Sequence, residues 1–222
     1  MKHNLIRATI ACILIATVGQ YVRAQGTFAN LNFENPVLPL VEIPPGSGLV
    51  PITNALPGWT GYTYGSTPVD RVAHNGISLG NASIDFLGPG SGYPAFEGLY
   101  FVRLQMSFDR LTIPALAQTG MVPSDAQSIR FYAHSYMTLP VLDFGGQQIG
   151  LTILGGSSST YYVWGGDMSR FAGQTGELRF LGDFALDNIF FSDLPVVPEP
   201  GIFGLSALGA LVLGSRVWGR RR

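Results

Sequence analysis

Polar and aromatic side chains alternate with apolar ones between Ser128 and Tyr136, in a segment rich in residues that favour strands. Because successive side chains of a strand point to opposite faces, one face of this segment carries Arg130, Tyr132, His134 and Tyr136. Aromatic rings can stack on sugar rings and the polar groups can bind hydroxyls, so this face is a candidate glycan-binding surface. The alternative is a sheet face that a loop covers, with the tyrosine hydroxyls bound to neighbours.

Few residues are suited to catalysis. The sequence lacks a Gly-x-Ser-x-Gly nucleophile elbow, and its single cysteine, Cys12, lies in an apolar run at the N-terminus. His74 precedes an Asn-Gly turn signal, which leaves His134 as the one histidine that a catalytic triad could use. An acid pair such as Asp85 and Glu97 could serve a glycoside hydrolase, but spacing in the sequence does not fix their separation. We therefore predict a protein that is not an enzyme, with a hydrolase as the least favoured alternative.

Composition limits the classes of protein that fit. The chain has 222 residues with a formal net charge of −1, 46% hydrophobic and 12% aromatic residues, and a mean hydropathy of +0.26. Such a chain can bury a core, which argues against disorder, and it lacks the basic charge of a nucleic-acid-binding protein. The central segment, residues 25–195, holds six arginines and no lysine against thirteen acidic residues. Its acidic character argues against anionic partners.

Short strand signals, bounded by Gly, Pro, Ser or Asp, dominate the central segment. The expected strands are 28–33, 58–64, 83–87, 99–106, 128–136, 148–154, 161–164, 177–181 and 185–191. No helical periodicity of three turns or more accompanies them. We therefore predict an all-β fold, an antiparallel β-sandwich of the jelly-roll type.

Four sequence pieces along the central segment resemble the galactose-binding-like jelly roll, a superfamily that includes many carbohydrate-binding modules. They are 31–34 (LNFE), 98–104 (GLYFVRL), 166–174 (GDMSRFAGQ) and 186–189 (LDNI). In such folds the first and last strands lie close together, and carboxylates there often hold a structural Ca²⁺. The resemblance therefore implies a calcium site at Glu34 and Asp187, which Asn32 and Asp183 would join. The alternative is that these carboxylates are solvated or bind amides of loops.

The N-terminus has the pattern of a secretory signal peptide. Lys2 and Arg7 precede the uncharged apolar run 8–18, and the small residue Ala24 ends residues 1–24. We expect signal peptidase to cut between Ala24 and Gln25 after export by the secretion machinery. The alternative, an uncleaved membrane helix, is disfavoured because eleven residues cover only roughly 17 Å of the roughly 30 Å hydrocarbon layer.

The C-terminal segment, residues 196–222, joins three features in order. A Pro-Glu-Pro tripeptide formed by Pro198, Glu199 and Pro200 precedes an apolar stretch expected to form a transmembrane helix over 201–218. A basic tail over 219–222 follows. It contains Arg220, Arg221 and Arg222, which would stay on the cytoplasmic side.

This order resembles the PEP-CTERM sorting signal of Gram-negative bacteria that make extracellular polysaccharide. In that family an exosortase of the inner membrane recognises the Pro-Glu-Pro motif and is thought to cleave nearby. The resemblance implies a precursor held in the inner membrane and a product at the cell surface or in the extracellular matrix. For the central domain we predict a non-catalytic surface or matrix component. The alternative is a module that binds extracellular polysaccharide through the 130–136 face.

Overall fold

The computed structural model describes residues 26–64, 66–76, 81–157 and 159–197. These described residues form fourteen strands, one four-residue helix and one short 3₁₀ helix. In order they are β1 (Leu49–Pro51), α1 (Ile52–Ala55), β2 (Thr60–Tyr64), β3 (Thr67–Val69), β4 (Arg71–His74), β5 (Ser83–Leu87), β6 (Phe101–Gln105), β7 (Ala115–Met121), β8 (Ser128–Ser135), β9 (Val141–Phe144), β10 (Gln147–Ile149), β11 (Leu151–Gly156), β12 (Tyr162–Asp167), η1 (Ser169–Phe171), β13 (Thr175–Leu181) and β14 (Phe184–Ser192).

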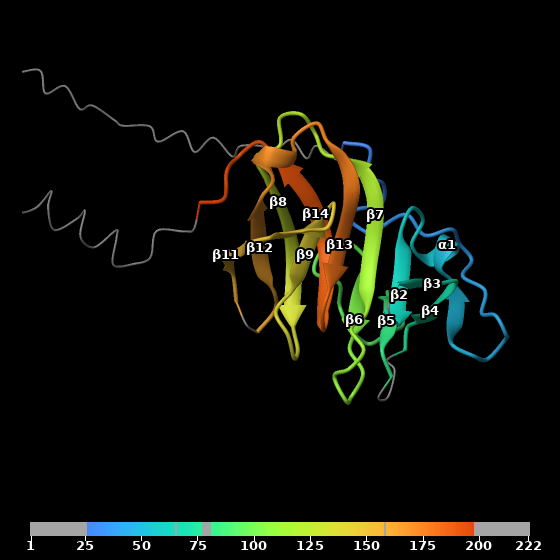
Figure 1. Cartoon of the computed structure of the whole chain (residues 1–222). Coiled ribbons are helices and arrows are strands. Elements are labelled where there is room, and N and C mark those ends of the chain that lie inside the picture. Colours follow the sequence, from blue (N-terminus) through green and yellow to red (C-terminus); the bar gives the residue numbers. More distant parts are fainter. Residues whose placement is uncertain (1–25, 65, 77–80, 158, 198–222) are drawn as a thin grey trace, which may run out of the picture.

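The strands form two sheets that lie face to face (Figure 1). One sheet has eight strands in the order β1-β4-β5-β6-β14-β8-β12-β11, and the other has six in the order β10-β9-β13-β7-β2-β3. All the paired neighbours are antiparallel except β4 and β5, which run parallel. The predicted all-β antiparallel sandwich is therefore confirmed.

Aromatic and aliphatic side chains from the inner faces of both sheets fill the core. Phe131 of β8 meets Phe180 of β13 edge to face, with ring centroids 5.2 Å apart, and Phe180 in turn packs near Trp59. The residues of β8 alternate as predicted, since Ile129, Phe131 and Ala133 are fully buried. Their outward neighbours are therefore available on the other face of the eight-stranded sheet.

The predicted strand 28–33 is wrong. Residues 26–36 form turns and irregular backbone, and Asn30 and Phe33 have φ values of +50° and +61°. Left-handed backbone of this kind cannot continue a strand. The segment instead lies against both sheets, where Ile189 N donates to Leu31 O over 3.0 Å and Trp59 Nε1 donates to Asn30 O over 3.0 Å. The predicted strand 148–154 is divided between β10 and β11.

The predicted signal peptide and its cleavage site at Ala24 and Gln25 lie outside the described residues, as do the Pro-Glu-Pro motif, the 201–218 helix and the arginine tail. Within the described ranges, no helix has both the length and the apolar character needed to cross a membrane.

Candidate functional site

The outer face of the eight-stranded sheet carries a row of functional side chains that the strand register brings together. Asp85 of β5 lies opposite Arg103 of β6, Arg103 lies opposite Ala185 of β14, and Ala185 lies opposite His134 of β8. Because paired residues of neighbouring strands point to the same face, these four side chains form one line across the sheet. The line leads from the buried carboxylate of Asp85 to the half-buried ring of His134.

The segment 88–98, between β5 and β6, crosses this face and walls off a groove. Ala95 and Phe96 of the segment pack on Leu87, Phe101 and Ala185. Between this segment, the end of β8 and the loop that joins β11 to β12 lies a cavity of ≈ 330 Å³. Its lining includes Tyr93, Phe96, Phe101, His134, Tyr136 and Tyr161. We call this cavity the aromatic groove.

Rings on the β12 side of the aromatic groove hold one another in place. Tyr161 stacks on Tyr132 with centroids 4.6 Å apart and packs against Phe96 at 5.0 Å. Phe96 also contacts Phe101, at 5.8 Å. Because these rings already pack together, a ligand that used them would need to order few side chains on binding.

Tyr136 is the most solvent-accessible of the four predicted glycan-face residues, with 46% of its surface exposed. The guanidinium carbon of Arg103 lies 4.2 Å from the centroid of the Tyr136 ring, and the ring of His134 meets it edge to face at 4.9 Å. Partial burial raises the pKa of the Tyr136 phenol above its ordinary value, so the hydroxyl stays protonated and able to donate at neutral pH.

Arg130, the remaining residue of the predicted glycan face, binds the end of the described chain instead. Its Nη2 donates to Pro195 O over 3.3 Å, its Nε donates to Ser128 Oγ over 3.3 Å, and Ser128 Oγ donates to Leu194 O over 2.7 Å. Arg130 and Ser128 therefore hold the last described residues of the chain against the start of β8. Of the predicted face, His134 and Tyr136 line the aromatic groove, and Tyr132 supports it through Tyr161.

Of the two residues predicted to bind calcium, Asp187 holds the segment 88–98 and Glu34 holds the two residues that follow it. Asp187 Oδ2 accepts from Phe96 N at 3.0 Å and Glu97 N at 2.9 Å, and Asp187 Oδ1 accepts from Asn188 N at 2.6 Å. Glu34 Oε1 accepts from the backbone N–H groups of residues 99 and 100, at 2.9 Å each. This close approach needs Gly98, whose φ is +68° and where a Cβ would collide with the Glu34 carboxylate.

These contacts match the alternative reading, in which the carboxylates bind loop amides. The N–H groups direct their positive ends at the oxygens that would face a cation, so the arrangement does not fit a calcium site well. Among the described residues no group of three or more His, Cys, Asp or Glu side chains could hold a metal ion. The calcium site at Glu34 and Asp187 stays an untested prediction.

Chelation tests that prediction. Because N–H donors already satisfy Glu34 and Asp187, we expect EDTA to leave the melting temperature of the protein unchanged in differential scanning calorimetry. A fall that added CaCl₂ reverses, and that MgCl₂ at the same concentration does not, would establish the calcium site instead.

Two buried carboxyl groups make stability depend on pH. Burial raises the pKa of Asp187 to about 7 and that of Asp85 to about 6, against 3.8 for an unperturbed aspartate. At pH values between the ordinary pKa of 3.8 and these raised pKa values, the folded state binds more protons than the unfolded state. The free energy of unfolding therefore falls as pH rises through this range. Asp109 and Asp167 have lowered pKa values, because serine hydroxyls and backbone N–H groups bind their charged forms, and they oppose this trend below pH 4.

We therefore expect maximal stability near pH 4.5 and a loss of several kcal/mol by pH 8, the order of magnitude that such shifts imply. Urea unfolding in EDTA at pH 4.5, 6 and 8 measures it. A free energy of unfolding that rises steadily from pH 4.5 to 8 would contradict the burial effect.

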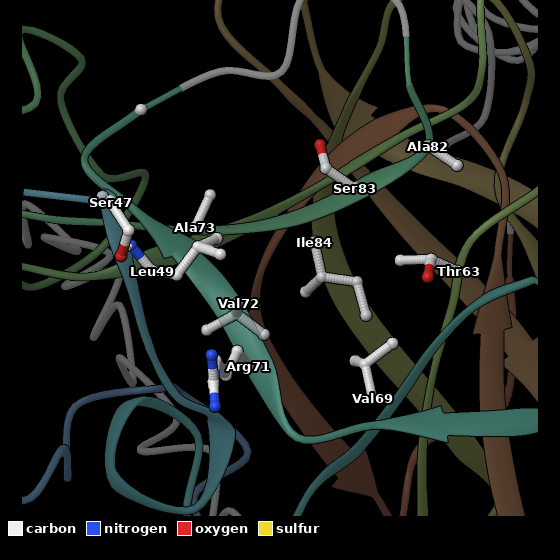
Figure 2. A pocket seen from close by; sticks show the side chains of 12 residues that line it. Ser47, Leu49, Thr63, Val69, Arg71, Val72, Ala73, Ala82, Ser83 and Ile84 are labelled. Carbon is white, nitrogen blue, oxygen red and sulfur yellow. Dashed lines mark hydrogen bonds between the residues drawn. The ribbon is translucent and has the colours of Figure 1, made fainter. Parts of the chain in front are cut away.

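A second cavity, of ≈ 410 Å³, lies between the two sheets beside the parallel strands β4 and β5. Figure 2 shows the aliphatic side chains of Val69, Val72 and Ile84 gathered around it. It has no aromatic lining, and Arg71 is its one charged lining residue. The aromatic groove is therefore the better candidate for a binding site.

The acid pair considered for hydrolysis is engaged elsewhere. Asp85 Oδ2 accepts from Ser83 Oγ over 3.2 Å, and Glu97 accepts from Asn188 Nδ2. Asp85 is fully buried and does not line the aromatic groove. Sequence reasoning missed Tyr93, Phe96 and Arg103, whose places in the site depend on the course of the segment 88–98 and on strand register.

No protein-family model and no curated protein sequence matches the chain. Among solved structures it is similar to a family 11 carbohydrate-binding module from Clostridium thermocellum, determined in complex with a β-1,3-1,4-mixed-linked tetrasaccharide. The two are 12% identical, the match covers 68% of this chain and 97% of the module, and the TM-score is 0.36. It is also similar to TmCBM61, determined in complex with β-1,4-galactotriose. Here the identity is 12%, the coverage is 79% of this chain and 100% of the other, and the TM-score is 0.33. Because both TM-scores are low, the candidate site is inferred from the residues of this chain alone.

Proposed function

We propose that the β-sandwich is a non-catalytic module that binds a glycan in the aromatic groove. The observation that carries the proposal is the groove itself, where Tyr93, Tyr136 and Tyr161 line one cavity on a sheet face. Tyr93 and Tyr136 are each about half exposed, at 51% and 46%, so part of each ring is open to a ligand at this cavity.

The lining suits the chemistry of a sugar. The C–H faces of a pyranose ring can pack on tyrosine and phenylalanine rings, which are already fixed by their neighbours. Hydroxyl groups of the sugar can bind the phenol of Tyr136, the imidazole of His134 and the side chains of Ser159 and Thr160, all at the same cavity. An apolar lining with a few convergent polar groups is the usual make-up of such a site.

The charge of the domain favours a neutral glycan. Acidic residues outnumber arginines thirteen to six in residues 25–195, and no lysine is present there. Of the residues that line the aromatic groove, His134 alone can become positively charged. A polymer rich in uronic acids would therefore meet net repulsion.

Retention on immobilised polysaccharides, measured with the purified full-length protein, tests the proposal. The panel contains the neutral polymers mixed-linkage β-glucan, β-1,4-galactan, galactomannan and dextran, and the uronate polymers alginate and polygalacturonate. We expect binding to at least one neutral polymer and to neither uronate polymer. Tyr136→Ala and Tyr161→Ala should each weaken that binding about tenfold or more.

The matched control is Tyr64→Ala, because Tyr64 is 58% exposed on β2 of the other sheet. It should bind like the wild-type protein. Binding that Tyr64→Ala weakens as much as Tyr136→Ala would contradict the groove. Retention on no polymer would favour the other reading, in which the folded domain is a structural component of the surface or matrix without a sugar ligand.

The same proposal includes the route of the protein to the outside. Its support is the sequence resemblance at both ends, a signal peptide over 1–24 and a Pro-Glu-Pro signal with a basic tail over 196–222. The protein would be exported, held in the inner membrane as a precursor and handed to an exosortase. The mature domain would then act at the cell surface or in the extracellular matrix, where a neutral extracellular polysaccharide is the proposed partner.

A further inference from the structure

Arg103 joins the aromatic groove to a buried acidic cluster. Its guanidinium covers one face of the Tyr136 ring at 4.2 Å, while its strand partner is Asp85. Asp183, in the turn between β13 and β14, adds a second carboxylate near the Tyr136 phenol. Asp85 and Asp183 are 0% and 2% exposed.

Each carboxylate is fixed by one of its oxygens. Asp85 Oδ2 accepts from Ser83 Oγ at 3.2 Å, and Asp183 Oδ2 accepts from Met106 N at 3.2 Å. The other oxygens, Asp85 Oδ1 and Asp183 Oδ1, and the Nε of Arg103 are buried and have no hydrogen-bond partner within the described structure. The charge of Arg103 opposes the effect of burial on the pKa of Asp85, its partner on the neighbouring strand, so the two groups attract each other across the sheet.

A planar guanidinium has a use here that an ammonium group would not have. It can lie flat on an aromatic ring while its charge is balanced from the side. With Arg103 on one face and His134 at its edge, the Tyr136 ring is supported on two sides, yet 46% of the residue stays exposed. The free ring surface is then fixed in orientation before any ligand arrives, which lowers the entropic cost of binding.

We propose that Arg103 is a positioning residue of the aromatic groove: held by the charge of Asp85 on the neighbouring strand, it keeps Tyr136 as a fixed stacking platform for a sugar ring. This inference rests on the proposed glycan-binding function. It makes the charge of Asp85 a regulator of the groove, because protonation of Asp85 removes the charge that holds Arg103.

The pH at which this happens follows from the surroundings of Asp85. Ser83 lies on its own strand, Arg103 on β6 and Asp183 in the adjoining turn, while its partner on β4 is the uncharged Ala73. Burial raises the pKa of Asp85 to about 6. Ligand affinity should therefore fall as pH drops through about 6. His134 and Tyr93 also face Tyr136. Since a histidine ordinarily titrates in this range, His134 needs its own control.

The decisive variant is Arg103→Lys, which keeps the positive charge beside Asp85 but loses the planar group over Tyr136. We expect its melting temperature to stay near that of the wild-type protein. Its affinity for the neutral polymers of the panel, measured by isothermal titration calorimetry, should fall about tenfold, as for Tyr136→Ala. Wild-type affinity in Arg103→Lys would overturn the inference and leave the glycan-binding function standing.

Two further measurements separate positioning from a merely structural role. Between pH 7.5 and 5 the wild-type protein and His134→Gln should both lose affinity, whereas Asp85→Asn should bind weakly and equally at both pH values. A pH dependence that His134→Gln removes and Asp85→Asn keeps would overturn the role of Asp85.

The ring-flip rate of Tyr136, measured by NMR without ligand, should rise in Arg103→Lys. If the wild-type protein binds no polymer, the proposed function fails, and this rate alone decides the inference. An unchanged rate would overturn it.

Discussion

Replacing Glu199 with glutamine is expected to leave the full-length precursor in the inner membrane. By resemblance, the carboxylate between Pro198 and Pro200 is part of what an exosortase recognises, and glutamine keeps the shape of the side chain while removing its charge. An effect close to all or none is expected, because a recognition site that hydrogen-bonds a carboxylate rejects an uncharged analogue strongly. Fractionation of cells that make exosortase, followed by immunoblotting of membrane and extracellular fractions, measures it.

The contacts near the end of the described chain sharpen this experiment. Ser128 and Arg130 bind the carbonyl oxygens of Leu194 and Pro195, so the folded domain reaches to within three residues of Pro198, a distance of at most about 10 Å. Asp193→Asn is the matched control, because Asp193 is an exposed acid beside that anchor. It should be processed normally. Normal release of Glu199→Gln would remove the sorting assignment.

Replacing Asp187 with alanine is expected to lower the free energy of unfolding by about 2–4 kcal/mol, as expected when a carboxylate that serves several buried N–H groups is lost. Asp187 is 0% exposed and accepts from the backbone N–H groups of Phe96, Glu97 and Asn188. These donors would lose their partner in a place that water reaches poorly. The relief of a buried charge offsets part of the loss, and this is why the effect should be larger at pH 5 than at pH 8.

Urea unfolding of Asp187→Ala at both pH values, in EDTA, measures this. Asp167→Ala is the control, because Asp167 also accepts a backbone N–H, from Ser169, but is exposed at the end of β12. It should cost less than about 1 kcal/mol. Equal losses in the two variants would mean that Asp187 does not hold the segment 88–98. Since Phe96 belongs to that segment, Asp187→Ala should also weaken binding in the aromatic groove.

The class of fold follows from local signals that tertiary structure did not override. Alternation at residues 128–136 and the short segment 83–87, with its β-branched and aromatic residues, are local strand signals, and both segments form the expected strands. The segment 28–33 also looks like a strand, but Asn30 and Phe33 have left-handed backbone, and the segment buries Leu31 and Phe33 in the core. This backbone conformation is determined by packing against residues that are distant in the sequence, so no local sequence pattern indicates it.

The candidate site was predictable only in part, for a related reason. His134 and Tyr136 share a strand face with Tyr132 and Arg130, so their grouping is a matter of spacing. Arg103 and Phe96 reach them through register and through a segment that Asp187 holds from about ninety residues away in sequence. Arg130 shows the opposite case. It has the right position in the pattern, but the passing end of the chain uses its hydrogen bonds.

Strand β8 carries the anchor of the chain end at its first residues and Tyr136 just past its last. Six residues of extended strand separate Arg130 from Tyr136, about 20 Å at the usual rise. If residues beyond Pro195 tether the molecule to a surface, the sandwich acts as a rigid spacer. It then holds the rings of the aromatic groove at a distance from that surface. A tethered copy could then sample polymer strands outside the crowded headgroup layer without any flexible stalk.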